Sequence, residues 1–373
     1  MKVSIFIPSF ETGGVENNVI LYSKILVENN YDVDVVYTRA DKDKFALVDK
    51  RVNKVQIIPK IKIPSIHPRI VDSVNIIFEY YKYLKKNKKN VLVLSFQNSI
   101  IAILVCKLLN IQVIARVANH PNIVNVDGTL MTRFSNLLKN YIYRYATLII
   151  SNSKVTSKQI AINTKAKTDT IYNPSFSTKI VDMSKESIDD EVFNAIVGKK
   201  IISVGRLVKQ KDFTTLIKAF DLVQNNLECN LIIIGDGEYK ERLEQLVIKL
   251  NLQNKVYLLG YKQNPHKYIA NSDLFVLSSL YEGLPNVLIE AIAVGTPSIS
   301  TNCLSGPSEI LLDGKGGDLV EVENIEELAK AIEKNLLNVE YAKEKHKIAY
   351  NSLDRFSYEK VQKNLLKLVD FYE

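Results

Sequence analysis

Short apolar runs alternate with amphipathic helical patterns along the whole chain, and this alternation limits the available folds more than any other feature. Apolar runs of four to six residues bounded by turn residues are typical of buried parallel strands, which helices must connect. The sequence therefore predicts an α/β protein with two doubly wound sheets. In the first half, strands are expected at 3–8, 33–37, 54–58, 91–95, 112–117, 147–151 and 169–172, and helices at 15–29, 70–87, 98–109, 130–145 and 154–162. In the second half, strands are expected at 200–204, 230–234, 255–259, 274–278, 298–301 and 318–322.

The length of 373 residues suits two domains of roughly 100 to 200 residues each. Asn173-Pro174 ends the last strand of the first half, and residues 175–199 are polar and weakly periodic, which is typical of a linker. We therefore expect an N-terminal domain at 1–174, a C-terminal domain at 175–352 and a terminal segment at 353–373. The terminal segment has the pattern of an amphipathic helix with the apolar residues Phe356, Val361, Leu365, Leu368 and Phe371.

The chain is basic, with a formal net charge of +8 and an isoelectric point near 9.0. This charge favours polyanionic partners, namely phosphorylated substrates, anionic lipid or nucleic acid. No aromatic-and-basic recognition motif supports nucleic acid, so it is not expected as a partner. The segment 80–89 is rich in tyrosine and lysine and has two interpretations, contact with an acidic membrane surface or the solvated end of a helix.

The cysteines and the N-terminus indicate a cytoplasmic location. Cys106, Cys229 and Cys303 lie in apolar runs without pairing or ligand spacing, which predicts buried, reduced thiols. Residues 1–8 have the pattern of a first strand rather than of a signal peptide, and no stretch approaches the ~20 apolar residues of a membrane span. We expect a cytoplasmic protein with peripheral contact to the inner face of a membrane.

Two glutamates, Glu282 and Glu290, flank a Gly-Leu-Pro turn that follows the apolar run 274–277. Pro285 suits the first turn of a helix, where its missing N–H costs nothing. Both carboxylates are therefore expected near a helix N-terminus, which favours an anionic ligand such as a diphosphate. The spacing alone means little, because such pairs occur by chance in a chain rich in acidic residues.

A second strand-to-helix turn carries two cations. Arg206 and Lys211 follow the apolar run 201–204 and precede another helix. Because the carboxyl ends of parallel strands meet at one edge of a sheet, these cations predict a diphosphate clamp beside the two glutamates.

The C-terminal half resembles the retaining nucleotide-sugar glycosyltransferases of the two-domain GT-B architecture, family 4. The resemblance covers roughly 100 residues. The matching residues are Gly205-Arg206-Leu207 with Lys211, Gly235-Asp236-Gly237, Gly260, Glu282-Gly283-Leu284-Pro285, Glu290-Ala291 and Gly295-Thr296-Pro297, in family order and spacing. It implies two Rossmann-like domains facing across a cleft, with the terminal helix crossing back to the first domain.

The resemblance also implies roles for individual residues. Glu290 would bind the ribose hydroxyls, and Glu282 would bind the donor sugar on its reacting side. Arg206 and Lys211 would stabilise the departing diphosphate without a metal or another cofactor, and the anomeric configuration would be retained. The other residues implied to line the donor are Gly205, Tyr261, Gly283, Leu284, Pro285, Asn286 and Val287.

Two features of the first half resemble parts of the same site. Gly13-Gly14 follows the first strand and resembles the family's glycine loop facing the donor phosphates or the acceptor, although a tight turn also explains it. His120 corresponds to a histidine that contacts the donor sugar in the family, but Arg116 nearby blurs the match, and a structural histidine is the alternative. His67, His266 and His346 lie in polar or loop contexts and are assigned no role.

Metal ligands are not predicted. Asp32-Val-Asp34 and Asp41-Lys-Asp43 fit the Asp-x-Asp pattern of glycosyltransferases with the other main fold, but the pattern is common, and both pairs are interpreted as surface residues. No other cluster has metal-ligand spacing.

The segment 301–311 is similar to bacterial family members that extend lipid-linked oligosaccharides for capsule, O-antigen or glycoprotein glycans, which favours a UDP-linked hexose or N-acetylhexosamine as donor. Glu309 in this segment either faces the site or belongs to a helix cap formed by Ser305 to Glu309. Three alternative functions remain: a sugar-nucleotide epimerase, a glycosyl phosphorylase, and a non-catalytic protein that binds nucleotide sugars or polyanions.

Overall fold

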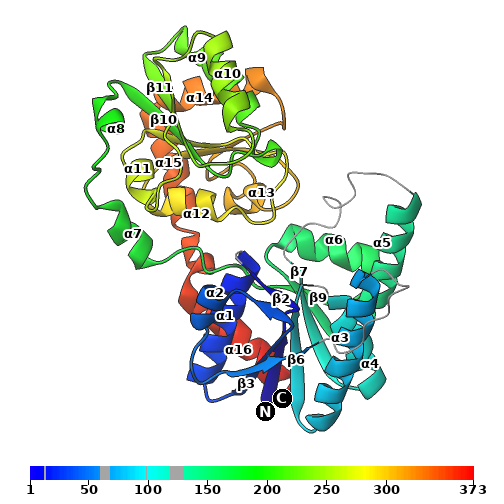
Figure 1. Cartoon of the computed structure of the whole chain (residues 1–373). Coiled ribbons are helices and arrows are strands. Elements are labelled where there is room, and N and C mark those ends of the chain that lie inside the picture. Colours follow the sequence, from blue (N-terminus) through cyan, green and yellow to red (C-terminus); the bar gives the residue numbers. More distant parts are fainter. Residues whose placement is uncertain (12–13, 59–67, 98, 118–129) are drawn as a thin grey trace. The chain divides into compact units, whose positions relative to one another are not determined.

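The computed structural model describes residues 1–11, 14–58, 68–97, 99–117 and 130–373, which form two compact units (Figure 1). Unit 1 comprises Met1–Tyr172 and Val361–Glu373, and unit 2 comprises Asn173–Lys360. Each unit contains one extended parallel sheet with helical connections between its strands. The predicted fold class, with two doubly wound sheets, is confirmed.

The large sheet of unit 1 has seven parallel strands in the order β5-β3-β1-β6-β7-β8-β9. Their bounds are β1 Lys2–Phe6, β3 Asp32–Tyr37, β5 Asn53–Gln56, β6 Val91–Phe96, β7 Gln112–Val117, β8 Leu148–Ser151 and β9 Thr168–Thr170. β6 is buried along its whole length, as expected for a strand covered on both faces. Two short strands, β2 (Ser9–Phe10) and β4 (Arg39–Ala40), form a separate parallel pair.

The connections of unit 1 are mostly helical. Its helices before the interdomain boundary are α1 Gly14–Glu28, α2 Lys42–Ala46, α3 Pro68–Lys86, α4 Ser99–Leu109, α5 Leu130–Tyr143 and α6 Lys154–Thr164. α4 is the most apolar of them and contributes Ile101, Val105 and Cys106 to the core. The prediction of buried, unpaired thiols is confirmed for all three cysteines.

The last helix, α16 (Tyr358–Phe371), begins after a 3-10 turn at Leu353–Phe356, and most of it belongs to unit 1. The ammonium group of Met1 lies 3.0 Å from Oε1 of Glu373, so the two termini are close together. The buried apolar residues of α16 are Val361, Leu365 and Val369. Phe371, which the sequence placed on the apolar face, is instead exposed, because the helix ends there.

Unit 2 has six parallel strands in the order β12-β11-β10-β13-β14-β15. Their bounds are β10 Lys199–Val204, β11 Cys229–Ile234, β12 Val256–Leu258, β13 Leu274–Leu277, β14 Ser298–Thr301 and β15 Asp318–Val320. The main helices are α9 Phe213–Gln224, α10 Lys240–Lys249, α11 His266–Ala270, α12 Asn286–Ala293, α13 Pro307–Ile310, α14 Ile325–Leu337 and α15 Val339–Tyr350. Residues of α9, α10 and α14 pack on the sheet in one apolar core.

The segment 175–199, expected to be a linker, contains two short helices, α7 (Thr178–Ser184) and α8 (Glu191–Ala195). Asp190 caps α8 and pairs with Lys262 at 2.7 Å, and the ring of Phe193 is buried against Tyr268. Periodicity did not indicate these helices, because each is shorter than two turns.

The structure corrects one interpretation of a unit 1 side chain and limits another. Asp34, interpreted as a surface residue, is buried because it lies in the inner strand β3, and Lys2, Asn53 and Tyr83 contact its carboxylate. Tyr80, in the segment proposed to face a membrane, is fully buried and stacks on Phe6, so its ring is not available to lipid. Among the described residues, no helix is both long and apolar enough to cross a bilayer.

Candidate functional site

The loops that follow β10, β11 and β12 are joined through their glycines at one edge of the unit 2 sheet. The N–H of Gly205 donates to the carbonyl of Ile234 at 2.9 Å, and the N–H of Gly235 donates to the carbonyl of Gly260 at 2.9 Å. Gly235 has a φ of +147°, and a Cβ there would lie 1.8 Å from the carbonyl oxygen of Gly205. Only glycine fits this close approach, which explains part of the Gly-Asp-Gly motif in physical terms.

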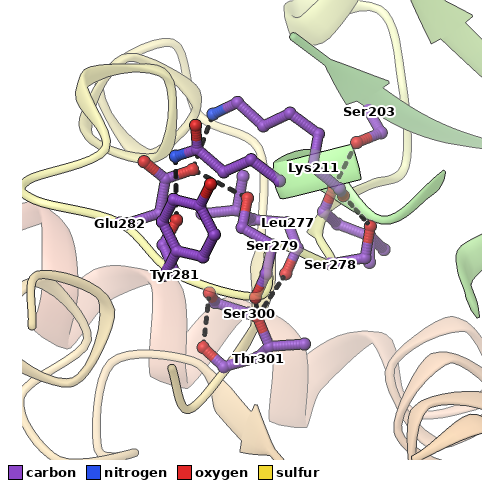
Figure 2. A network of polar contacts seen from close by, with 11 residues as sticks. Ser203, Lys211, Leu277, Ser278, Ser279, Tyr281, Glu282, Ser300 and Thr301 are labelled. Carbon is purple, nitrogen blue, oxygen red and sulfur yellow. Dashed lines mark hydrogen bonds and ion pairs between the residues drawn. The ribbon is translucent and has the colours of Figure 1, made fainter. Parts of the chain in front are cut away.

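Lys211 and Glu282 meet at the centre of this edge (Figure 2). Nζ of Lys211 lies 2.6 Å from Oε1 of Glu282, and Oγ of Ser279 donates to the same oxygen at 2.7 Å. The side chain of Lys211 is 15% exposed and that of Glu282 is 8% exposed. The sequence placed both residues in one site, but their direct ion pair was not anticipated.

Hydrogen bonds to backbone carbonyls join the loop that carries Lys211 to the loop that carries Glu282. The N–H of Leu280 donates to the carbonyl of Gln210 at 2.8 Å, and Nε2 of Gln210 donates to the carbonyl of Tyr281 at 2.9 Å. Oγ of Ser278 donates to the carbonyl of Lys211 at 2.9 Å (Figure 2). The loop after β10 and the loop after β13 therefore form one rigid frame, which fixes the Lys211–Glu282 geometry.

The Gly-Leu-Pro turn leads into α12. Leu284 and Pro285 are buried and Val287 is half-buried, whereas Asn286 is exposed and its Oδ1 accepts a hydrogen bond from Ser175 at 2.8 Å. Pro285, the N-cap residue of α12, makes no side-chain cap bond, and the first turn of the helix contains no acidic residue. The first N–H groups of the helix can therefore bind an anion.

The next loop supports this turn. Oγ of Ser305 donates to the carbonyl of Gly283 at 3.0 Å, and a Cβ on Gly306 would lie 2.4 Å from that same carbonyl oxygen. Gly306, rather than Ser305, is the N-cap residue of α13. The hydroxyl of Ser305 serves the Gly283 turn instead.

Glu290 lies in a different environment from Glu282. Its carboxylate has no hydrogen bond from another described residue, and Oε2 lies 3.9 Å from Nδ1 of His266 at the start of α11. Burial raises the pKa of Glu290 to about 7 and lowers the pKa of His266 below its usual value. His266 was assigned no role from the sequence, since only the packing of α11 on α12 brings it to Glu290.

Two of the predicted site residues are exposed. Arg206 lies at the end of the Gly205 loop, and its guanidinium pairs with no carboxylate of the described chain. Tyr261 follows Gly260 and is 75% exposed. Both side chains are therefore available to a ligand at the carboxyl edge of the unit 2 sheet.

The predicted site residues of unit 1 give less support for a functional site than those of unit 2. Gly13 and His120 lie outside the described residues, and Gly14 begins α1. Arg116 is buried on β7, where its guanidinium donates to the hydroxyl of Tyr22 and packs on that ring, 4.9 Å from the centroid. Arg116 therefore contacts the core of unit 1. No group of three or more potential metal ligands occurs in the part of the chain that the structure describes.

A comparison with models of protein families matches the region that contains Lys211 and Glu282. Residues 185–355 match the family model described as "Glycosyl transferases group 1". This stretch lies within unit 2. It contains every element of the frame around Lys211 and Glu282.

Two curated relatives match over somewhat more than half of the chain. An uncharacterized glycosyltransferase of Methanocaldococcus jannaschii is 40% identical over 207 residues, which is 54% of this chain and 51% of the relative. An N-acetylgalactosamine-N,N'-diacetylbacillosaminyl-diphospho-undecaprenol 4-alpha-N-acetylgalactosaminyltransferase of Campylobacter jejuni is 33% identical over 207 residues, covering 55% of this chain and 54% of the relative. The matched stretch therefore spans about half the length of each of these relatives.

Solved structures match the whole chain. Anabaena HepE in complex with UDP has a TM-score of 0.79 at 18% identity, covering 99% of this chain and all of that one. The lipopolysaccharide outer core galactosyltransferase WaaB, in its apo form, has a TM-score of 0.76 at 19% identity over the full length of both chains. With the two parallel sheets, these likenesses identify the fold as GT-B.

Proposed function

We propose that this chain is a retaining family 4 glycosyltransferase. It moves a hexose or an N-acetylhexosamine from a nucleotide sugar to a glycan or lipid-linked oligosaccharide in the biosynthesis of a cell-surface polysaccharide such as capsule or O-antigen. The observation that supports this most is the buried Lys211–Glu282–Ser279 cluster inside the stretch that matches the group 1 glycosyl transferase model. Fold likeness alone would not support an activity, whereas this cluster provides the charges that the reaction needs.

The reaction separates charge, and the proposed roles follow from that. The acceptor oxygen bonds to the anomeric carbon while the bond from that carbon to the diphosphate breaks, and the electron pair leaves with the diphosphate. Arg206, Lys211 and the first N–H groups of α12 stabilise the departing diphosphate. The acceptor proton passes to a phosphate oxygen, so attack occurs on the face that the diphosphate leaves and the configuration is retained.

The two glutamates position the donor rather than react with it. Glu282, held by Lys211 and Ser279, accepts hydrogen bonds from the donor sugar hydroxyls. Glu290 accepts hydrogen bonds from the ribose hydroxyls, and Tyr261 lies along the donor. Catalysis then rests on orientation and electrostatics without a covalent intermediate, a metal or another cofactor.

The donor is proposed to be a UDP-sugar, because the similar HepE structures hold UDP in one complex and UDP-glucose in another. The acceptor is proposed to be lipid-linked, because the Campylobacter relative is named for an undecaprenol diphosphate substrate. We propose a cytoplasmic location with peripheral contact to an anionic membrane surface and no nucleic-acid partner, consistent with the net charge of +8.

Transfer assays with the full chain test this proposal. UDP-glucose, UDP-N-acetylglucosamine and UDP-N-acetylgalactosamine are each incubated with an undecaprenyl diphosphate oligosaccharide, and released UDP is measured. The proposal predicts release with one donor only when the acceptor is present. UDP release without acceptor would favour an epimerase. Release of a sugar 1-phosphate from the oligosaccharide in the presence of phosphate would favour a phosphorylase, and tight donor binding without any turnover would favour a non-catalytic binding protein.

A further inference from the structure

α5 carries an apolar stripe on its exposed side. Phe134, Leu137, Leu138 and Tyr141, here called the α5 face, follow helical spacing and are each between 51% and 69% exposed. On the other side of the helix, Ile142 and Tyr143 are buried in the unit 1 core. The fold therefore does not need the α5 face, and a contiguous exposed apolar surface of this kind marks an interaction site.

The surroundings of the α5 face are basic. Arg133 and Arg144 flank it on α5 and just beyond its end, and both are exposed. On the neighbouring helix α4, the ammonium group of Lys107 lies 2.9 Å from the centroid of the Tyr145 ring, and Leu108 is 74% exposed. These cations and rings form a mixed apolar and basic surface, as membrane-surface helices do.

The charge of the chain is concentrated in this region. Residues 97–168 contain nine Lys and Arg residues and a single acidic residue, Asp127. Their excess of eight positive charges equals the formal net charge of the whole protein, +8. The remaining residues sum to no formal net charge, so this stretch accounts for the positive excess of the chain, of which Arg116 is buried.

We infer that the α5 face is the surface by which this protein lies on an anionic lipid bilayer. Its aromatic and aliphatic side chains would enter the interface, while Arg133, Arg144 and Lys107 contact the headgroups. In the other membrane-facing candidate, 80–89, Tyr80 is buried and Tyr81 and Tyr83 are half-buried, so its rings are less exposed than the side chains of the α5 face. This inference specifies the membrane contact proposed above and rests on it, but it does not depend on the donor chemistry.

Co-sedimentation of the full chain with vesicles tests the inference. Vesicles of phosphatidylglycerol mixed with phosphatidylcholine are compared with pure phosphatidylcholine. The double variant Phe134→Ser/Leu137→Ser should bind the anionic vesicles at least about tenfold more weakly than wild type, because two interfacial side chains are lost. The matched control is Ile248→Ser/Leu337→Ser, which replaces two exposed apolar residues of unit 2 (59% and 69% exposed) and should bind like wild type.

A charge variant measures the electrostatic contribution to vesicle binding. Arg133→Gln/Arg144→Gln should weaken binding to anionic vesicles roughly 25-fold at low salt, given about fivefold for each cation near the surface. This difference should largely disappear at about 1 M salt, where charges are screened within ~3 Å. A charge variant that binds like wild type at low salt would overturn the inference.

Measurements of UDP binding and of oligomeric state distinguish a loss of membrane contact from other causes of weak vesicle binding. The thermal shift produced by UDP should be unchanged in all α5 variants, which shows that unit 2 is folded and that the donor proposal is unaffected. Equal vesicle binding by wild type and the α5 apolar variant overturns the inference. So does a concentration-dependent dimer of wild type that the α5 apolar variant abolishes, because a second copy would then cover the α5 face.

Discussion

Glu282 and Glu290 come from one short motif, yet unit 2 holds them in opposite ways. The carboxylate of Glu282 accepts from an ammonium group at 2.6 Å and from a hydroxyl at 2.7 Å, so its charge is compensated. Among the described residues, the carboxylate of Glu290 has only an imidazole nitrogen at 3.9 Å, and burial raises its pKa to about 7. Spacing in the sequence therefore locates the pair, but the surroundings of each residue decide its protonation and its chemistry.

The largest expected effect comes from removing the charge of Lys211, which pairs with the carboxylate of Glu282. Lys211→Met should lower kcat/KM for transfer by ~10²–10³, because the diphosphate loses a charged contact in the transition state. Lys209→Met, in the same 3-10 turn but exposed, should stay within about threefold of wild type. Equal losses in the two variants, measured by UDP release, would show that the effect is not specific to the Glu282 pair.

The Lys211–Glu282 ion pair should also contribute to the free energy of unfolding. Lys211→Met leaves the buried carboxylate of Glu282 without its cation, which is expected to cost about 3 kcal/mol. For a unit of this size, that cost corresponds to roughly 6–12 °C in the unfolding midpoint measured by calorimetry on the full chain. The double variant Lys211→Met/Glu282→Gln should recover part of the loss, since no uncompensated charge remains. A double variant less stable than Lys211→Met would contradict this explanation.

For Glu290, stability should depend on pH in the direction set by its raised pKa. The folded state then binds more protons than the unfolded state between pH ~4.5 and ~7, so this residue's contribution falls across that window as pH rises. The total change attributable to Glu290 is at most about 3 kcal/mol. Glu290→Gln should remove it, which unfolding midpoints at pH 5 and pH 8 would measure. Identical pH dependence in wild type and Glu290→Gln would refute the raised pKa.

Nucleotide binding should sharpen the contrast. If Glu290 accepts hydrogen bonds from ribose hydroxyls, UDP favours its ionised form, so binding releases a proton near pH 6.5 and tightens as pH rises to about 7. Titration calorimetry in buffers of different ionisation enthalpy measures that proton. No proton release by wild type, or the same release by Glu290→Gln, would separate Glu290 from the ribose.

The smallest effect is expected for His266. Its pKa is lowered by burial, so the ring is neutral near pH 7 and contributes little charge to Glu290 at 3.9 Å. His266→Gln should therefore change UDP affinity by less than about threefold. A change above tenfold would mean that His266 positions Glu290, and the two carboxylates would then be more alike than the structure indicates.

The sequence predicted the sheets, and the turns that carry the candidate site residues, for a clear physical reason. Strands buried on both faces are continuous apolar runs, and the turns after them carry Arg206, Lys211 and Glu282 in a recognisable order. Contacts that depend on packing were not predictable. The meeting of His266 with Glu290 requires α11 to pack on α12, and the burial of Asp34 requires partners from β1, β5 and α3.

The exposed apolar face of α5 shows the same limit. Periodicity predicts a helix at 130–145 with an apolar stripe, but a stripe normally faces the core. Here the core side is formed by Ile142 and Tyr143, and the residues left outside include Phe134 and Leu137. Only the docked position of the helix distinguishes the two faces.

The central claim is that the carboxyl edge of the unit 2 sheet binds a nucleoside diphosphate, and the thermal midpoint tests it most directly. UDP, GDP and ADP are added separately at millimolar concentration to wild type and to Arg206→Ala, whose side chain is exposed and has no structural partner among the described residues. A ligand at 100 times its dissociation constant should stabilise wild type by ~2.7 kcal/mol. The account predicts a shift with UDP that Arg206→Ala loses or strongly reduces. No shift with any of the three nucleotides would contradict it.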